Sequence, residues 1–341
     1  DPRGAIHDQG HSVNVLSGGS LGAQGRPATL GVMGGGQLGR LFVRAAQSMG
    51  YATVVLDPDA TSPAGMVSTY HVQTDYLDEQ GLAQLIQRSS AITTEFENVP
   101  AGALITLGSH RWVAPSGESV AICQDRGMEK RLFTLAGVPC APHRVIAAET
   151  DLTQVPSDLF PGILKSARMG YDGKGQVPVA DAAGLLAAWQ SLKQVPCVFE
   201  QRLPLQREIS VVLARDSQGN TVHLPVQQNL HRDGILAVTQ VPAPQVSAQI
   251  QAQALAATVR IAESLGYAGV LCVEFFVLAD GSLVANEMAP RPHNSGHHSL
   301  DSCDLSQFDL QVRVLAGLPL VTPRQHSAAV MLNLLGELWL A

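Results

Sequence analysis

The chain has 341 residues and a formal net charge of −7, which suits two or three domains and argues against general affinity for nucleic acids. Hydrophobic residues make up 45% of it and charged residues 15%, as in a folded globular protein, and no apolar run reaches the ~20 residues of a membrane-spanning helix. The five cysteines are widely spaced without a CxxC pair, which is typical of reduced thiols and of a cytoplasmic protein.

The first 27 residues are rich in Gly, Ser, Gln and His. They lack the apolar core of a secretory signal. We therefore expect residues 1–27 to be a disordered leader or a segment added to the natural chain, and the fold to begin after them.

A βαβ unit is predicted over residues 28–59. An apolar strand at 29–33 leads into the glycine-rich turn 34–39, a helical pattern follows, and a second strand at 52–56 ends in Asp57. The turn matches GxGxxG, and a helix N-terminus at such a turn offers amides and a positive dipole to an anion. One interpretation is a dinucleotide-binding dehydrogenase with Asp57 on the ribose. The other is that these glycines bind a different phosphate or only allow tight packing.

The α/β alternation continues with a helix at 81–90 and a strand in "AITTEFENVP", which ends in Glu95 and Glu97. Carboxylates at the carboxyl end of such a strand lie where ligands bind.

A further helix is predicted over residues 119–139, ending at the glycine and proline near its carboxyl end. It carries three cations, Arg126, Lys130 and Arg131. For Lys130 and Arg131 we expect a solvated, charged helix face.

From about residue 140 the pattern becomes α+β. The strand "GILKSA" carries Lys165 and leads into the glycine-rich loop "RMGYDGKGQ". Exposed amides beside cations favour a phosphate site, although the loop is not a Walker A motif. The alternative is a flexible hairpin tip with solvated lysines. A helix at 182–192, two strands around Glu200 and Glu208, and a long helix at 247–265 follow.

Two late strands flank Asp280-Gly281, a dipeptide typical of a two-residue hairpin turn. That turn would set Glu274 directly opposite Glu287 on one face. Two opposed carboxylates in apolar strands repel unless a proton or a cation lies between them, and oxygen ligands facing a phosphate loop suggest Mg²⁺. The alternative is a shifted register with one glutamate in solvent.

Six motifs in this order resemble one family. They are "GVMGGGQLGR", "TTEFENVP", "QDRGMEK", "GYDGKGQ", "QNLHRDGIL" and "NEMAPRPHNSGH", and they are similar to those of the 5-(carboxyamino)imidazole ribonucleotide synthases, which are ATP-grasp ligases. The resemblance covers roughly residues 28–336. It implies an α/β ATP-grasp fold with a Rossmann-like pre-ATP-grasp domain at 28–125, an ATP-grasp domain at 126–321, and the start of a truncated C-terminal domain at 322–341.

The resemblance implies ATP, Mg²⁺, bicarbonate and aminoimidazole ribonucleotide as ligands. ATP would phosphorylate bicarbonate to carboxyphosphate, and the exocyclic amine of the ribonucleotide would then be carboxylated, releasing ADP and phosphate. A cytoplasmic homodimer without nucleic-acid or membrane partners is also implied.

Site residues carried over by the resemblance fall into four groups. The nucleotide site would comprise Arg126, Lys165, Gly170, Tyr171, Asp172, Gly173, Lys174, Gly175, Gln176, Glu200, Gln201, Arg202, Leu203, Glu208, His231, Asn286 and Glu287. Substrate contacts would come from Gly36, Gln37, Leu38, Glu95, Tyr171, Arg291, His293, Asn294 and Ser295. The metal ligands would be Glu274 and Glu287, and the catalytic groups Asp172, Arg291 and His293.

Three alternatives remain open from the sequence. A sister ATP-grasp ligase, such as the formate-dependent glycinamide ribonucleotide transformylase or biotin carboxylase, would share the ATP site. A truncated ATP-binding module without activity is the second, because the family's basic closing motif would lie beyond Ala341. A dehydrogenase that uses residues 34–39 and Asp57 is the third.

Overall fold

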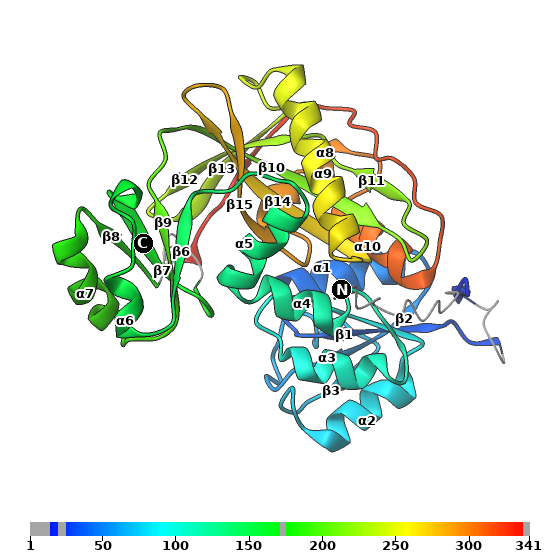
Figure 1. Ribbon diagram of the computed structural model, residues 1–341. Helices are drawn as coiled ribbons and strands as arrows, with labels where there is room; N and C mark the ends of the chain where they lie inside the picture. The colour runs from blue at the N-terminus through cyan, green and yellow to red at the C-terminus, as the bar shows by residue number, and fades with distance from the viewer. Residues whose placement is uncertain (1–13, 20–24, 171–174, 337–341) are drawn as a thin grey trace, which may run out of the picture.

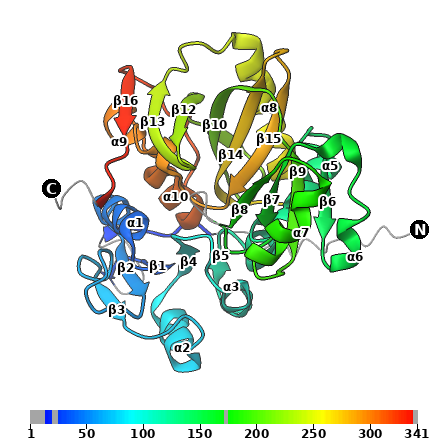
Figure 2. The same cartoon turned by 90° about the vertical axis from the view of Figure 1, so that its left-hand side faces the viewer.

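The computed structural model describes residues 14–19, 25–170 and 175–336, which form three β-sheets with flanking helices. Figure 1 shows the N-terminal sheet at the bottom, a small sheet at the left and a large sheet at the top, and Figure 2 shows the same three parts from the side.

Part of the predicted leader is ordered against the fold. The Leu16 amide donates to the Ala316 carbonyl at 2.9 Å, and the Tyr51 hydroxyl donates to the Leu16 carbonyl at 2.8 Å. The prediction of a disordered leader is therefore wrong for residues 14–19, because Leu16 gains an apolar neighbourhood and two backbone hydrogen bonds. Residues 1–13 and 20–24 lie outside the described residues.

The N-terminal sheet has five parallel strands in the order β3-β2-β1-β4-β5. This order brings β1 and β4 side by side at the switch point, and ligands of open α/β sheets bind beyond the carboxyl ends of strands at such a point. The predicted strands at 29–33 and 52–56 are confirmed. The elements are β1 (Thr29–Met33), α1 (Gln37–Ser48), β2 (Ala52–Leu56), β3 (Tyr70–Val72), α2 (Glu79–Arg88), β4 (Ala91–Thr94), α3 (Ala101–Gly108) and β5 (Trp112–Val113).

The helix predicted over residues 119–139 is two helices, α4 (Gly117–Cys123) and α5 (Arg126–Leu135). The Asp125 carboxylate starts the second one by accepting from the amides of Gly127 and Met128 at 2.9 and 3.1 Å. An aspartate N-cap satisfies amides that have no partner within the helix. The break turns Arg126 and the residues after it toward the large sheet.

The small sheet is antiparallel, with strand order β6-β9-β7-β8. Apolar residues on its inner face pack against α7, and β7 carries Lys165 beside the Glu200 strand. Its elements are β6 (His143–Ile146), α6 (Glu149–Leu152), β7 (Gly162–Ser166), β8 (Gln176–Val179), α7 (Ala182–Ser191) and β9 (Cys197–Gln201).

The large sheet has seven strands, ordered β15-β14-β10-β12-β13-β16 with β11 on β10. The last strand, β16, lies within the segment 322–341 and pairs with β13 at the edge of this sheet. The elements are β10 (Leu205–Arg215), β11 (Thr221–His223), β12 (Gln227–Arg232), β13 (Ile235–Val241), α8 (Ala248–Ser264), β14 (Gly269–Leu278), β15 (Leu283–Ala289), α9 (Ser299–Ser302), α10 (Gln307–Ala316) and β16 (Ala329–Leu332).

Helix α10 joins the N-terminal sheet to the large one. Its apolar side chains share one core cluster with residues of β1, α1, β10 and β14. The buried Gln311 amide donates to the Thr93 hydroxyl at 3.1 Å, at the end of β4. The carboxyl ends of β1 and β4 therefore face the large sheet.

The β14–β15 hairpin differs from its prediction in two places. The loop has three residues, because Leu278 and Ser282 form the closing backbone pair and Gly281 adopts a φ of +83°, as in a type I turn followed by a left-handed glycine. A β-bulge at Asn286 then shifts the register, so that Phe275 faces Ala285 but Glu274 faces Glu287. The predicted acid pair is confirmed, and the predicted two-residue turn is wrong.

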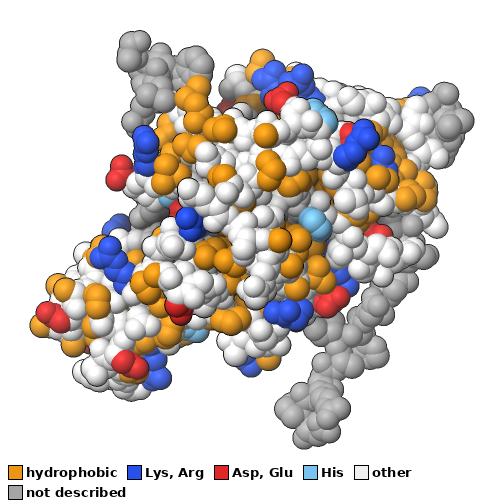
Figure 3. Space-filling view, turned by 90° about the horizontal axis from the view of Figure 1, so that it is seen from above, with side chains coloured by type: hydrophobic (Ala, Val, Ile, Leu, Met, Phe, Trp, Pro, Cys, Tyr) orange, Lys and Arg blue, Asp and Glu red, His pale blue; other side chains and the backbone are white. Residues whose placement is uncertain are grey.

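The described surface has two further features that bear on function. On the face drawn in Figure 3, the basic side chains that are described lie in small scattered groups beside acidic ones, not in a broad basic patch. Within the described ranges, no helix is long and apolar enough to cross a membrane.

Candidate active site

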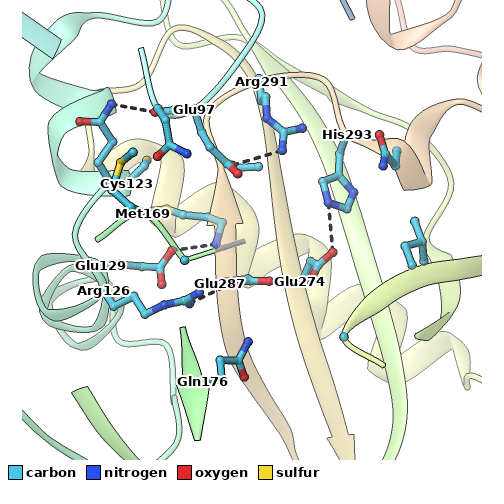
Figure 4. Close-up of a pocket in the computed structure, with 18 of the residues that line it drawn as sticks. Glu97, Cys123, Arg126, Glu129, Met169, Gln176, Glu274, Glu287, Arg291 and His293 are labelled. Carbon is cyan, nitrogen blue, oxygen red and sulfur yellow. Dashed lines mark hydrogen bonds and ion pairs between the residues drawn. The ribbon is translucent and has the colours of Figure 1, made fainter. Parts of the chain in front are cut away.

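A polar cavity opens where the three sheets converge (Figure 4). Helix α5, the loop after β7, strands β12, β14 and β15, and the loops after β4 and β15 all contribute to its wall. The predicted site residues that line it are Arg126, Gly170, Gln176, His231, Glu274, Glu287, Arg291, His293 and Asn294.

The opposed carboxylates of Glu274 and Glu287 lie on the sheet wall of this cavity (Figure 4). Burial and the charge of Glu287 raise the pKa of Glu274. Burial also raises the pKa of Glu287, but Arg126, 3.0 Å away, and Lys165 more than offset this and hold that pKa well below its usual range. Two facing acids of which one resists ionisation fit a cation site.

The ligand chemistry of this pair suits Mg²⁺. Across the described residues, no group of three His, Cys, Asp or Glu side chains is arranged to hold a metal ion. Mg²⁺ commonly takes one or two carboxylates and completes its shell with water and substrate phosphates. The two glutamates therefore fit an ion that arrives with a phosphate ligand.

Two lysines share the Glu200 carboxylate. The Nζ atom of Lys165 is 3.0 Å from Oε2, and that of Lys130 is 3.3 Å from Oε1. Burial raises the pKa of Glu200, but the charges of the two lysines lower that pKa by more, so the carboxylate stays ionised. The prediction that Lys130 is solvated is wrong, because its side chain is 1% exposed, whereas Arg131 is exposed as predicted.

His231 reaches the cavity from β12. Its Nδ1 lies 2.6 Å from the Glu208 carboxylate on the neighbouring strand. Burial lowers the pKa of this imidazole, but the hydrogen bond to Glu208 and the charges of Glu274 and Glu208 raise it overall. The two predicted nucleotide-site residues therefore act as a pair.

Arg291 and His293 lie at the cavity end nearest the N-terminal sheet. The Arg291 guanidinium donates to Glu97 at 3.2 Å and to the Pro292 carbonyl at 2.9 Å. His293 Nε2 lies 3.1 Å from Glu274 Oε1, and burial together with Arg291 lowers the pKa of His293 to about 3. At neutral pH this end therefore presents one fixed cation and one neutral imidazole.

A buried polar network orients His293 from behind. The Ser295 hydroxyl lies 2.8 Å from His293 Nδ1 and 2.8 Å from the Ser210 hydroxyl, which also contacts Gln227 and Asn229. The Ser295 side chain is fully buried. In this conformation the predicted substrate contact is a support for His293 and does not face the cavity.

The glycine-rich turn after β1 already binds carboxylates of the chain itself. The Gly35 amide donates to Asp57 at 2.7 Å, and the Gly36 and Gly39 amides donate to Glu95 at 3.1 and 3.3 Å. Gly34 has a φ of +100°, and a Cβ there would meet the Glu95 side chain. Because Asp57 also accepts from a tyrosine hydroxyl, these contacts disfavour the dinucleotide-binding interpretation.

The remaining predicted residues lie away from the cavity wall or outside the described ranges. The Gln201 amide donates to the Asp158 carbonyl at 2.9 Å, and Arg202 and Gln37 are exposed. Tyr171, Asp172, Gly173 and Lys174 fall on residues that the structure does not describe. Leu203 and Leu38 are partly buried, Gly175 binds Ser166 through its carbonyl, and Asn286 forms the bulge in β15.

Two residues in or beside the cavity, Glu129 and Lys130, were missed as site residues from the sequence, whereas Glu97 was marked there as a carboxylate at a strand end where ligands bind. Glu97 holds Arg291, Glu129 accepts from the Met288 amide at 2.9 Å, and Lys130 contacts Glu200. The alternation in "TEFEN" gave a signal for Glu97, since residues two apart on an extended segment share a face. No comparable signal marked Glu129 or Lys130, whose partners are distant in the sequence.

We expect the unfolding free energy of the parent chain to fall with rising pH relative to Glu129→Gln. Burial, opposed by the charges of Lys130 and Arg126, raises the pKa of Glu129 from 4.5 to about 8. Between those values the folded state keeps a proton that the unfolded state has released, so each pH unit costs the parent chain up to about 1.4 kcal/mol. Denaturant unfolding of both chains across this window measures the difference, with exposed Glu118→Gln as the control. Equal slopes for parent and Glu129→Gln would contradict the buried, neutral carboxyl.

Family models and relatives match most of the chain. The model of the ribonucleotide synthetase preATP-grasp domain matches residues 27–124, and that of the ATP-grasp domain matches residues 131–308. An N5-carboxyaminoimidazole ribonucleotide synthase of Brucella melitensis is 42% identical over 91% of this chain and 86% of its own.

Solved structures agree with these matches. The N5-carboxyaminoimidazole synthetase of Staphylococcus aureus complexed with ADP has a TM-score of 0.86 and 36% identity, covering 95% of this chain and 86% of its own. The synthase of Aspergillus clavatus in complex with ADP and aminoimidazole ribonucleotide has a TM-score of 0.83 and 29% identity, covering 90% and 81%. The predicted α/β ATP-grasp fold with an N-terminal pre-ATP-grasp domain is confirmed, and the chain belongs to the N5-carboxyaminoimidazole ribonucleotide synthase family of ATP-grasp ligases.

Proposed function

We propose that the chain catalyses the ATP-dependent carboxylation of aminoimidazole ribonucleotide with bicarbonate, a step of purine biosynthesis. ATP phosphorylates bicarbonate to carboxyphosphate, and the exocyclic amine then takes up the carboxyl group to give N5-carboxyaminoimidazole ribonucleotide, ADP and phosphate. The observation that carries this proposal is one cavity in which Arg126 contacts Glu287 of the acid pair, His293 contacts Glu274, and Arg291 lines the wall beyond His293.

The nucleotide would bind between the small and large sheets. Arg126 lies 3.0 Å from Glu287 and can turn to the phosphates once a cation neutralises that carboxylate. Lys165 is fixed by Glu200, so its ammonium is oriented before ATP arrives. The backbone amides of residues 170–176 would close over the phosphates, as the family resemblance implies, and the His231–Glu208 pair would meet the ribose side of the nucleotide.

Mg²⁺ would be held by Glu274 and Glu287. Bound there, the ion would neutralise phosphate charge and orient the phosphates for transfer. The fit rests on the raised pKa of Glu274, since burial and a neighbouring like charge make an unneutralised second carboxylate costly.

The carboxylation end of the cavity is assigned to Arg291, His293 and Asn294. A partly buried guanidinium held in place by Glu97 can stabilise the anionic carboxyphosphate, because its charge is already in place when the reaction begins. His293, neutral at physiological pH, would handle the proton of the substrate amine together with Asp172. The ribonucleotide would approach from the side of Gly36, Gln37, Leu38 and Glu95.

We further infer a cytoplasmic homodimer with the domain division given above, at residues 28–125, 126–321 and 322–341. The family resemblance supports the dimer. The five cysteines are free thiols, which supports a reducing compartment.

ADP release tests the reaction. We expect release to require ATP and bicarbonate together with aminoimidazole ribonucleotide, and the carboxylated product to appear in step with ADP. Each substrate is omitted in turn, with glycinamide ribonucleotide plus formate and free biotin as matched alternative acceptors. Turnover supported by one of these alternatives but not by aminoimidazole ribonucleotide would assign the chain to a sister ligase.

A further inference from the structure

The position of Glu287 depends on the bulge in β15. Next to the hairpin loop, Phe275 pairs with Ala285 and Phe276 with Val284. Continued without interruption, this register would set Asn286 opposite Glu274 and turn Glu287 to the other face of the sheet. The extra residue at Asn286 restores the opposition of Glu274 and Glu287. The acid pair therefore exists only while the bulge persists.

Helix α5 binds the backbone on both sides of Glu287. The Lys130 ammonium donates to the Asn286 carbonyl at 3.0 Å, and the Met288 amide donates to Glu129 Oε2 at 2.9 Å. Glu129 and Lys130 are 2% and 1% exposed. Consecutive residues of one helix thus hold the two backbone groups that flank the proposed metal ligand.

These contacts satisfy backbone groups of β15, which is the edge strand of the large sheet and has a strand neighbour on one side only. A bulge disrupts the ladder locally, and a buried backbone group without a partner destabilises the conformation that contains it. Glu129 and Lys130 supply the partners from outside the sheet. Lys130 also lies 3.3 Å from Glu200, so the same side chain joins the bulge to the neighbourhood of Lys165.

We infer that Glu129 and Lys130 are positioning residues that hold the β15 bulge and thereby present Glu287 to the metal ion. This inference rests on the proposed function, since it concerns the ion held by the two glutamates. Neither residue needs to touch the ion or the substrates. The pair acts through the backbone on either side of Glu287.

The inference is tested by measuring the affinity of the full chain, saturated with ADP, for Mn²⁺. Electron paramagnetic resonance of the free ion gives the amount of Mn²⁺ that stays unbound. We expect Glu129→Met, which removes the acceptor for the Met288 amide, to weaken Mn²⁺ binding about 10- to 100-fold, as loss of an outer-shell support commonly does. Glu129→Gln keeps a carbonyl acceptor and should bind Mn²⁺ within about threefold of the parent, and Lys130→Met should resemble Glu129→Met. Exposed Arg131→Met on the same helix is the matched control.

The outcomes separate the inference from the proposed function. A parent chain that binds ADP but no Mn²⁺ contradicts the proposed metal site and the inference with it. Normal Mn²⁺ affinity in folded Glu129→Met and Lys130→Met contradicts the inference alone, and so does equal weakening in Glu129→Gln and Glu129→Met. If Glu129→Met does not fold, Lys130→Met compared with Arg131→Met decides the question, with the exchange rate of the Met288 amide as a second readout.

Discussion

Replacing Arg291 by methionine is expected to lower kcat for carboxylation about 10²- to 10³-fold, as removal of one preorganised donor to a developing anion commonly does. The side chain is 16% exposed and is held by Glu97 at 3.2 Å and by the Pro292 carbonyl at 2.9 Å. A guanidinium fixed in this way needs no reorientation when carboxyphosphate forms. Methionine fills a similar volume without charge, so the loss reports electrostatics more than packing.

Two measurements make the Arg291 prediction specific. Product formation with saturating ATP, bicarbonate and ribonucleotide gives kcat, and calorimetry with ADP gives nucleotide affinity. We expect that affinity to change less than about threefold, because the proposed nucleotide site is at the Arg126 end of the cavity. Arg324→Met is the matched control, since that arginine pairs with Asp304 at 3.7 Å and is 82% exposed. A kcat within about threefold of the parent in Arg291→Met would remove Arg291 from the catalytic groups.

The hairpin illustrates what the sequence could and could not predict. Asp280-Gly281 correctly marked a tight turn, and the facing of Glu274 and Glu287 was predicted correctly, yet the loop is one residue longer and a bulge at Asn286 compensates. Turn residues are local signals. A bulge that depends on contacts from α5 is a tertiary effect, and no sequence pattern within β14 or β15 predicts it.

The N-terminal domain shows the same division between local and tertiary information. The βαβ pattern and the GxGxxG turn predicted the strands at 29–33 and 52–56 correctly, because glycine placement and apolar periodicity are local. The groups that the amides of this turn bind could not be predicted from such local patterns. Its amides bind Glu95 and Asp57, and only the strand order β2-β1-β4 brings those carboxylates to the turn.

Buried charge was the least predictable feature of the site. A helix lysine is usually solvated, and the burial of Lys130 follows from Glu200 and the Asn286 carbonyl, which are far from it in the sequence. Asp125, by contrast, was visible as a helix-capping residue type. The break between α4 and α5 could therefore have been predicted. The helix that starts there places Arg126 and Glu129 on the cavity wall and Lys130 against Glu200.

Glu287→Gln is expected to raise the Mg²⁺ concentration for half-maximal ATP turnover about 100-fold or more, since loss of a ligand should exceed the 10- to 100-fold cost of losing an outer-shell partner. The fold should survive, because glutamine still accepts from Arg126, now 3.0 Å from the carboxylate, and the substitution removes the repulsion with Glu274.

The Mg²⁺ titration of ATP turnover is measured beside the melting temperature, so that loss of the metal site is separated from loss of structure. Exposed Glu263→Gln on α8 is the control for a change of net charge. Without the Glu287 charge, Arg126 loses the anionic partner that holds it 3.0 Å away and can turn to the phosphates. ADP affinity measured without metal should therefore stay equal or rise. Turnover at limiting Mg²⁺ that matches the parent chain would mean that the facing of Glu274 and Glu287 serves the fold and not the ion.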